Sequence, residues 1–257
     1  MTKVASALKD AAFLWYDKDA DYMAATVAYY ALFAIAPLIL LTVTLLSLVF
    51  ERDLIRDELL RWGAVLGPDV NTLLSQAVLN LSELSVGIGV PIFGALFFSG
   101  MVVMMCNTIT SGFHSLWGIP HKGIKGWFLK SRNSILFLLV LELYLLVMIG
   151  SSFMTDSLGI GRIVFYFGAT TALFSIMYRV LPWSAPSLLA RLCGAAIASL
   201  LFTLAKVAVA SYVAMTPVPG LFGTAGLMLV LLIWLYVIAG IIYYGAAVAY
   251  TLDKTTK

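Results

Sequence analysis

The sequence contains few charged residues and few of the side chains that usually carry chemistry. Only 11% of its 257 residues are Asp, Glu, Lys or Arg, and it has two cysteines and two histidines. A soluble globular domain carries about 25% charged residues, so this composition excludes an ordinary soluble domain. The hydrophobic fraction is 62% and the mean hydropathy is +1.00. The chain is therefore predicted to be an integral membrane protein.

The sequence also lacks the short motifs that carry enzymatic chemistry. It has no HExxH metal motif, no GxSxG nucleophile and no glycine-rich phosphate loop. Cys106 and Cys193 lie inside apolar runs, where we expect small buried hydrophobic side chains. His114 and His121 have no nearby carboxylate and are expected at the membrane interface. We therefore expect no enzymatic activity, no cofactor and no metal.

Long apolar runs dominate what remains. A helix needs about 20 apolar residues to cross the hydrocarbon core, and each run provides roughly that length. None alternates like a membrane β-strand, and a helix satisfies its own backbone hydrogen bonds in lipid. We predict an all-α polytopic membrane protein, a single domain over residues 1–257, with six transmembrane helices at about 27–50, 88–113, 133–155, 163–181, 190–215 and 221–250.

The first run begins with AATVAYYALFAIAPLILL and continues to Phe50 without a charge. It exceeds the ~7–15 residues of a signal-peptide core, and the following ERDLIRDELLRW does not resemble a cleavage site. We interpret it as a retained first span. Tyr29 and Tyr30 are expected at the inner interface, where amphipathic rings are favoured. Pro37 is expected to bend the helix, because proline frees the carbonyl four residues earlier.

Two segments outside the spans have helical patterns. Over residues 1–20, apolar side chains recur at the spacing of an amphipathic helix, and we expect this helix to lie along the inner membrane interface. Residues 51–87 form the longest polar segment, divided by Gly67-Pro68. We predict an extracytoplasmic helical hairpin there.

The basic residues are distributed unevenly between the two sides of the predicted bundle. Only Arg52, Arg56, Arg61 and Arg162 lie on the side of residues 51–87, and Lys206 lies within a span. Because basic loops stay in the cytoplasm, both termini are predicted to be cytoplasmic. The other basic residues all lie on that side: Lys3, Lys9, Lys18, Lys122, Lys125, Lys130, Arg132, Arg179, Arg191, Lys254 and Lys257.

Two ionisable residues, Glu142 and Lys206, lie within predicted spans, where charge is costly in lipid. At 1.5 Å per residue their depths differ by about 10 Å. One interpretation is a proton or ion relay, or a charged lining for a substrate path that includes Arg132 and Arg179. The other is a structural pair, or a lysine whose side chain extends to the interface.

Several ordered landmarks of the chain resemble those of the YihY/BrkB family of bacterial inner-membrane proteins, long labelled ribonuclease BN. They include the first span, SLWGI at Ser115–Ile119, MYRVLP at Met177–Pro182, LAKVAVASY and GTAGLMLVLLIWLYVIAGIIYYGA. The resemblance implies a six-span inner-membrane protein with cytoplasmic ends. The motif residues, for which it implies a structural role, are Tyr29, Tyr30, Pro37, Trp117, Pro182, Tyr212, Gly223, Gly226, Trp234 and Gly245.

Three positions depart from the pattern of that family. His114 stands where the family often has Asn, Phe222 where it commonly has Tyr, and Ala247 where it often has an acidic residue. If the acidic residue serves an ion or proton step in relatives, Ala247 argues against the same step here.

Three functions fit these observations. The first is a transporter or flippase of a lipid-like or envelope-related molecule, and the second is an ion-coupled or proton-coupled exchanger that uses Glu142 and Lys206. The third is a non-transport partner in envelope assembly. We expect membrane lipids as partners and no nucleic acid, because the basic residues follow the positive-inside rule and most acidic residues lie on the other side. The substrate and the oligomeric state are not predicted.

Overall fold

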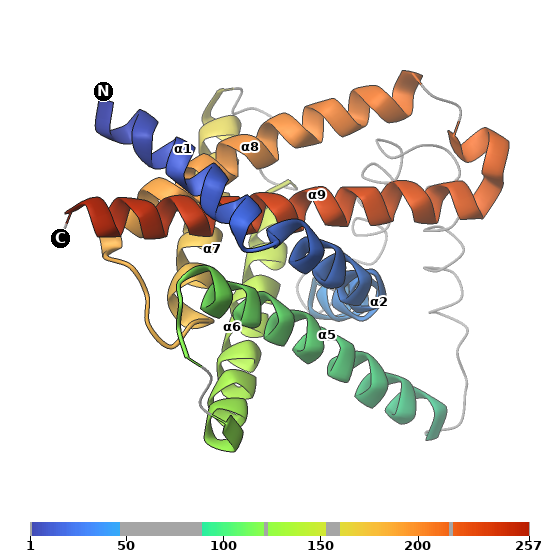
Figure 1. Cartoon of the computed structure of the whole chain (residues 1–257). Helices are drawn as coiled ribbons and strands as arrows, with labels where there is room; N and C mark the ends of the chain where they lie inside the picture. Colours follow the sequence, from blue (N-terminus) through green and yellow to red (C-terminus); the bar gives the residue numbers. More distant parts are fainter. Residues whose placement is uncertain (1, 47–88, 121–122, 153–159, 216–217, 257) are drawn as a thin grey trace.

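The computed structural model describes residues 2–46, 89–120, 123–152, 160–215 and 218–256. Over these ranges the chain is all-α, as predicted (Figure 1). Each predicted span overlaps one helix, and the ends of the predictions at 27–50, 88–113 and 133–155 lie outside the described residues. The predicted hairpin at 51–87 also lies outside them. The helices are α1 (Thr2–Asp17), α2 (Ala20–Leu46), α5 (Gly89–Leu116), α6 (Gly123–Ser152), α7 (Ile160–Val180), α8 (Leu188–Met215) and α9 (Val218–Thr256).

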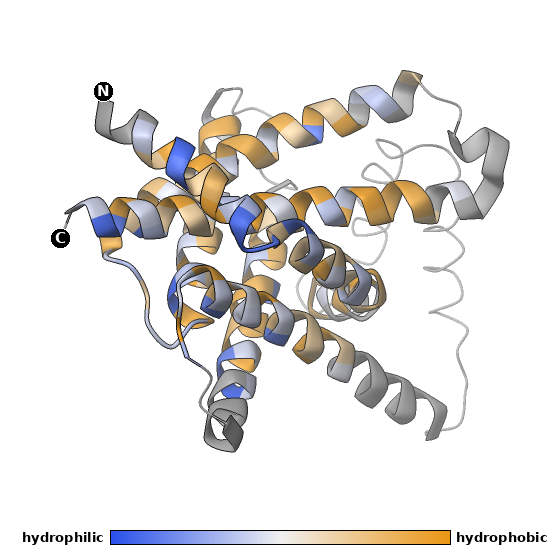
Figure 2. Ribbon diagram, in the orientation of Figure 1, coloured by the Kyte–Doolittle hydropathy of each residue, from blue (hydrophilic) through white to orange (hydrophobic). Residues whose placement is uncertain are grey.

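Long apolar helices make the chain a multi-pass membrane protein. Four stretches among the described residues are long and apolar enough to cross a bilayer, and α2 contributes a shorter apolar helix at Ala20–Ile35. Apolar residues cover most of these helices (Figure 2). No more than 33% of any of the four stretches is buried inside the protein, so lipid is the natural cover for the remainder. The four stretches are Ser131–Ile149, Ile163–Val180, Leu188–Val209 and Met228–Thr255.

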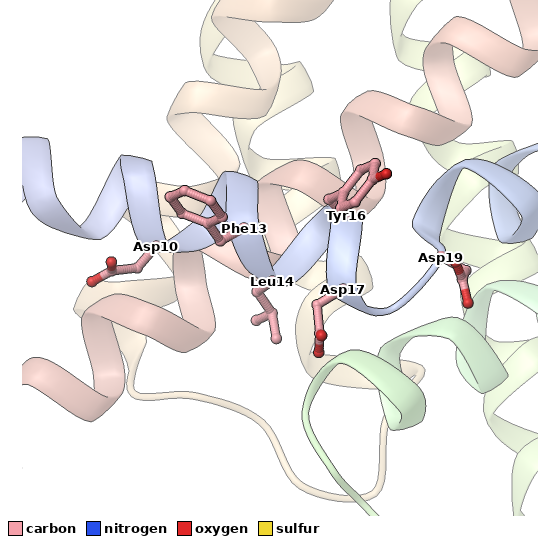
Figure 3. Close-up of a pocket in the computed structure, with 6 residues that line it drawn as sticks. All are labelled: Asp10, Phe13, Leu14, Tyr16, Asp17 and Asp19. Atoms are coloured by element: carbon pink, nitrogen blue, oxygen red, sulfur yellow. The ribbon is translucent and has the colours of Figure 1, made fainter.

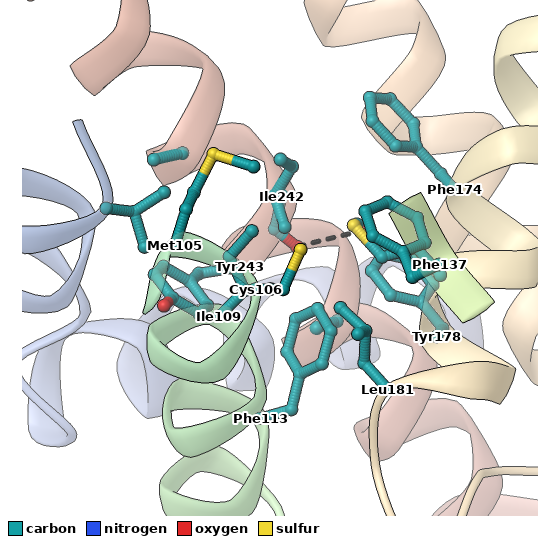
Figure 4. Close-up of a cluster of buried hydrophobic side chains, with 14 of the residues drawn as sticks. Met105, Cys106, Ile109, Phe113, Phe137, Phe174, Tyr178, Leu181, Ile242 and Tyr243 are labelled. Atoms are coloured by element: carbon teal, nitrogen blue, oxygen red, sulfur yellow. Dashed lines mark hydrogen bonds between the residues drawn. The ribbon is translucent and has the colours of Figure 1, made fainter. Parts of the chain in front are cut away.

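Helix α9 packs against four helices, α1, α2, α5 and α8, and α2 packs against α1, α5, α6 and α9. A cluster of buried aromatic and aliphatic side chains joins it to α5, α6 and α7 (Figure 4). Phe113 lies at the centre of this cluster, with its ring edge-on to those of Tyr178 and Tyr243 at 5.5 and 5.9 Å. Such edge-to-face contacts between rings add to the stability gained from packing.

The predicted N-terminal helix forms and lies against the C-terminal part of α9. Ala7 and Ala11 are buried, while Lys9 and Asp10 on the opposite face are exposed, as the amphipathic pattern predicted. The two helices are joined by a hydrogen bond from the Tyr244 hydroxyl to the carbonyl of Leu8 at 3.3 Å. The two ends of the chain therefore lie on the same side of the molecule (Figure 1).

Pro37 does not end α2, which is helical from Ala20 to Leu46. A proline removes one backbone hydrogen bond from a helix, and transmembrane helices tolerate this loss where neighbouring groups compensate. The proline is thus accommodated within a continuous helix rather than at a break between two helices.

Candidate functional site

The carboxyl group of Glu142 is the most unusual feature of the bundle interior. Glu142 lies on α6 with only 4% of its surface exposed. Thr42 of α2 lies beside it, but the Thr42 hydroxyl donates its hydrogen to the carbonyl of Leu38 at 2.8 Å. Neither carboxylate oxygen has a hydrogen-bond partner among the described residues. A buried carboxylate without a donor or a cation is costly, so this position favours a neutral carboxyl group or a bound cation.

Lys206 does not supply that cation. It is exposed on α8, and its Nζ lies 5.8 Å from the centre of the Phe202 ring. Within the described ranges the only ion pair joins Lys18 to Asp17, at 3.4 Å. Glu142 and Lys206 therefore form no ion pair, and the structural-pair interpretation does not hold.

The two arginines proposed to line a path are both exposed. The Arg132 guanidinium donates to the Asn133 side-chain oxygen at 3.3 Å. Next to it, the Ser134 hydroxyl donates to Asn107 Oδ1 of α5 at 3.0 Å, and this contact between α5 and α6 was not predicted. Ser134 lies about two helical turns from Glu142, so polar side chains recur along the inner face of α6.

A second feature is an apolar groove between α8 and α9. Its volume is about 310 Å³, and it is lined by Ala208, Val209, Tyr212, Val230 and Ile233. Tyr212, one of the family-motif residues, is therefore the single aromatic side chain in the lining. Lys206 lies one helical turn before Val209 and so is its neighbour on the surface of α8.

A larger groove, of about 670 Å³, lies where α1 turns into α2. Its six lining side chains point in different directions instead of converging on one point (Figure 3). None of the predicted site residues lines it. The residues are Asp10, Phe13, Leu14, Tyr16, Asp17 and Asp19.

The SLWGI motif, Ser115–Ile119, lies at the end of α5 and contacts α9. The indole of Trp117 donates to the carbonyl of Ala246 at 3.0 Å and stacks on Phe113 at 5.5 Å. Gly118 has φ +63°, a left-handed conformation that glycine adopts without strain and that commonly ends a helix. Trp117 of the motif therefore links the end of α5 to α9.

Gly245 allows α8 and α9 to cross at close range. A Cβ placed on Gly245 would lie 2.7 Å from Cβ of Ala198, and one on Gly194 would lie 2.8 Å from Cβ of Ala249. Both glycines are buried, and small residues of this kind let transmembrane helices approach closely. Ala247, the replacement for the family's usual acidic residue, is fully buried in α9.

The remaining family-motif residues occupy varied positions. Gly223 belongs to α9, but its surroundings are outside what the structure describes. Tyr29 is exposed and contacts Phe33 at 5.2 Å, whereas Tyr30 is partly buried. Trp234 lies 5.7 Å from Phe202, and Pro182 and Gly226 are buried.

One prediction about an individual residue was wrong. Cys193 is exposed on α8, although Cys106 is buried as predicted. A uniformly apolar helix does not reveal in its sequence which side faces lipid, and the error follows from this. His114 is buried in the protein, and its Nε2 accepts a hydrogen bond from the backbone N–H of Trp183 at 3.4 Å. His121 lies outside the described residues.

Two tyrosines that the sequence analysis did not single out are central to the packing. The Tyr178 hydroxyl donates to the carbonyl of Ile242 at 2.9 Å, and the Tyr243 hydroxyl donates to the carbonyl of Thr108 at 3.3 Å. Both rings are fully buried. Their hydroxyl groups in otherwise apolar runs were the available signal, since a buried tyrosine usually needs a hydrogen-bond partner.

No three His, Cys, Asp or Glu side chains gather into a possible metal site within the described ranges.

Comparison with known proteins places these features in a family. Residues 15–257 match the family described as "Virulence factor BrkB". A "UPF0761 membrane protein" of Coxiella burnetii (strain RSA 493) is 27% identical over 91% of this chain and 88% of its own length. Proteins of the same name from Alcanivorax borkumensis and Azotobacter vinelandii are 28% and 26% identical, over 87% and 91% of this chain and 54% and 60% of their own lengths. No solved structure matches the chain. With nearly its whole length matched, this chain belongs to the BrkB family of membrane proteins.

Proposed function

We propose that this protein is an inner-membrane transporter or flippase of a lipid-like, amphiphilic molecule. In this proposal six helices cross the membrane and both termini are cytoplasmic, and the protein is neither an enzyme nor a nucleic-acid-binding protein. The observation that carries the proposal is the apolar groove between α8 and α9. Apolar lining with a polar group at one position is what an acyl chain and its headgroup require.

The geometry of the two helices explains why a groove exists at this place. Near Gly194 and Gly245 the backbones touch, because neither residue has a side chain to separate them. Beyond this crossing α8 and α9 diverge (Figure 1). The groove lies in the diverging part, and Tyr212 and Ile233 in its lining are exposed on the outside of the bundle. A lipid chain can therefore enter from the side without crossing the protein interior.

Filling the groove tests the proposal. The protein is reconstituted into vesicles of phosphatidylcholine and phosphatidylglycerol with a fluorescent phospholipid, and transbilayer movement is measured by quenching from outside. Val209→Trp together with Ile233→Trp is expected to slow movement about tenfold, equivalent to about 1.4 kcal/mol. The matched control is Leu139→Trp, at a residue on α6 that is 63% exposed. Equal rates in the groove variant and the wild type would contradict the proposal.

An ion-coupled or proton-coupled exchanger is the second candidate, favoured by the buried carboxyl group of Glu142. Ionisable groups inside a membrane protein commonly mark ion or proton paths. Ion-driven flux is measured in vesicles for Glu142→Gln and, separately, for Lys206→Met. An exchanger that uses both residues loses flux in both variants, and one that uses the carboxyl group alone loses it only in the first. Flux unchanged in both variants removes this candidate.

The third candidate, a non-transport partner in envelope assembly, has no specific structural observation in its favour. It gains support only if neither lipid movement nor ion flux is detected with the wild-type protein.

A further inference from the structure

We infer that Arg179 and Arg191 form a binding site for the phosphate headgroup of an anionic phospholipid at the turn between α7 and α8. This goes beyond the proposed function, because a lipid bound at this site need not be one that the protein moves. The inference rests on the charge of the two side chains, their missing counter-ions and the apolar residues around them.

The two arginines come from different helices but share one corner of the molecule. Arg179 lies in the last turn of α7 and Arg191 in the first turns of α8. Helices α7 and α8 pack against each other, and the two side chains interact as like charges. An anion beside them would reduce this repulsion.

Neither arginine forms an ion pair with an acidic residue within the described ranges, where Lys18–Asp17 is the only such pair. The acidic side chain at this turn is Asp253 of α9, which accepts a hydrogen bond from the backbone N–H of Ser187 at 2.8 Å. Arg191 Nε is buried and has no hydrogen-bond partner among the described residues. A guanidinium group binds phosphate oxygens in a planar, two-bond geometry, so phosphate is a suitable counter-ion for the arginine pair.

The start of α8 adds a second source of attraction for an anion. The first backbone N–H groups of a helix lack partners within the helix, and its dipole places partial positive charge at this end. Phosphate groups are commonly bound at such positions. Part of this capacity is used by Asp253, which binds the N–H of Ser187 just before α8 begins. The arginine pair therefore supplies most of the attraction in this site.

Apolar side chains around the arginines indicate a lipid rather than a free anion. Leu188 and Leu189 begin α8 and are 61% and 72% exposed, and Leu192 follows Arg191 directly and is also exposed. Ile176, one turn before Arg179 on α7, is exposed as well. A phospholipid places acyl chains on such residues while its phosphate contacts the nearby cations, and basic pockets between membrane helices bind acidic lipids in this way.

The experiment measures lipid binding, without transport, on the purified full-length protein in detergent. Native mass spectrometry compares phosphatidylglycerol with phosphatidylcholine. We expect the wild type to prefer phosphatidylglycerol on the order of tenfold, since each basic residue near a membrane surface contributes severalfold. Arg179→Gln with Arg191→Gln should abolish the preference, and replacement of both by Lys should retain part of it.

The matched control is Lys254→Gln, which removes an exposed cation near the C-terminus whose Nζ lies 4.6 Å from the Tyr250 ring. This control should keep the full preference. A preference that persists in the double Gln variant overturns the inference. So does inorganic phosphate that displaces phosphatidylglycerol at equal concentration, because the site would then recognise phosphate without a lipid.

Should the double Gln variant not fold, Arg179→Gln alone decides the question, because the exposed position of Arg179 tolerates substitution. The Arg179→Gln variant should lose about half of the logarithm of the binding ratio between phosphatidylglycerol and phosphatidylcholine. An unchanged ratio overturns the inference. Since no lipid movement is measured, a negative result here leaves the proposed transport function untouched, and loss of transport leaves this site untouched.

Discussion

Glu142 is the residue whose surroundings fit its ionised form least well. An ionised carboxylate accepts hydrogen bonds and cannot donate them, yet the adjacent Thr42 hydroxyl has already given its hydrogen to Leu38. What Thr42 still offers is a lone pair. A neutral carboxyl group, which carries a hydrogen, is therefore better matched to this neighbour than a carboxylate. The contact between α2 and α6 thus depends on the chemical state of one side chain.

Glu142→Gln is expected to raise the free energy of unfolding by about 1 kcal/mol, because the amide can donate to the Thr42 oxygen and carries no charge. The measurement is a denaturant titration of the purified protein in detergent. The same substitution made in a Thr42→Val background has no acceptor for the amide and should give a smaller gain, because only the loss of the buried charge remains. A variant less stable than the wild type would show that the ionised carboxylate has a partner in the native state.

At the scale of helices, the crossing of α8 and α9 determines the position of the apolar groove between them. Helices α8 and α9 approach closely at Gly194 and Gly245, and the apolar groove lies where the two helices diverge. Tyr178 of α7 reinforces the crossing, because its hydroxyl bonds to the carbonyl of Ile242 in α9. The groove is thus a consequence of small residues at one position and larger ones further along.

Gly245→Ala is expected to destabilise the protein by about 1–3 kcal/mol, the usual cost of an added methyl group in a packed interior. The new Cβ would lie 2.7 Å from that of Ala198 and would also meet the Tyr178 hydroxyl. Gly168→Ala is the matched control, since a Cβ on this exposed glycine of α7 has nothing within 4 Å. Melting temperatures in detergent compare the two variants. Equal melting temperatures would mean that the helices can separate at little cost.

For the whole molecule, the packing of α1 on α9 constrains the topology. These two helices carry the ends of the chain, and the Thr251 hydroxyl donates to the carbonyl of Ala7 at 3.2 Å. In the proposed arrangement, six spans place both ends on the same face of the membrane, which agrees with this contact between α1 and α9.

Cysteine labelling tests the proposed topology in cells. In a chain with Cys106→Ala and Cys193→Ala, a membrane-impermeant maleimide should label Ser75→Cys from outside the inner membrane. Thr255→Cys should react only after the membrane is opened, because basic segments near the termini favour the cytoplasm. The chain without cysteines gives the background. Labelling of Thr255→Cys in intact spheroplasts would reverse the proposed orientation.

Much of the fold was predictable because hydrophobic length and helical period are local properties of the chain. Apolar runs of about 20 residues indicated the helices, and the period of residues 1–20 identified the buried face of α1. Small residues such as Gly194 and Gly245 permit close approach of helices, but the sequence does not record that these two meet. The ordered motifs of the chain indicated the BrkB family from the sequence alone, and the family match confirmed it.

The tertiary structure decided which residues meet. Glu142 and Lys206 both lie in apolar runs, but one faces the bundle and the other its surface, so no pair forms. The rotation of a helix that is apolar on every side is not recorded in its hydrophobic pattern. It is set by packing against neighbouring helices, and for this reason the burial of His114, the exposure of Cys193 and the groove beside Tyr212 appeared only in three dimensions.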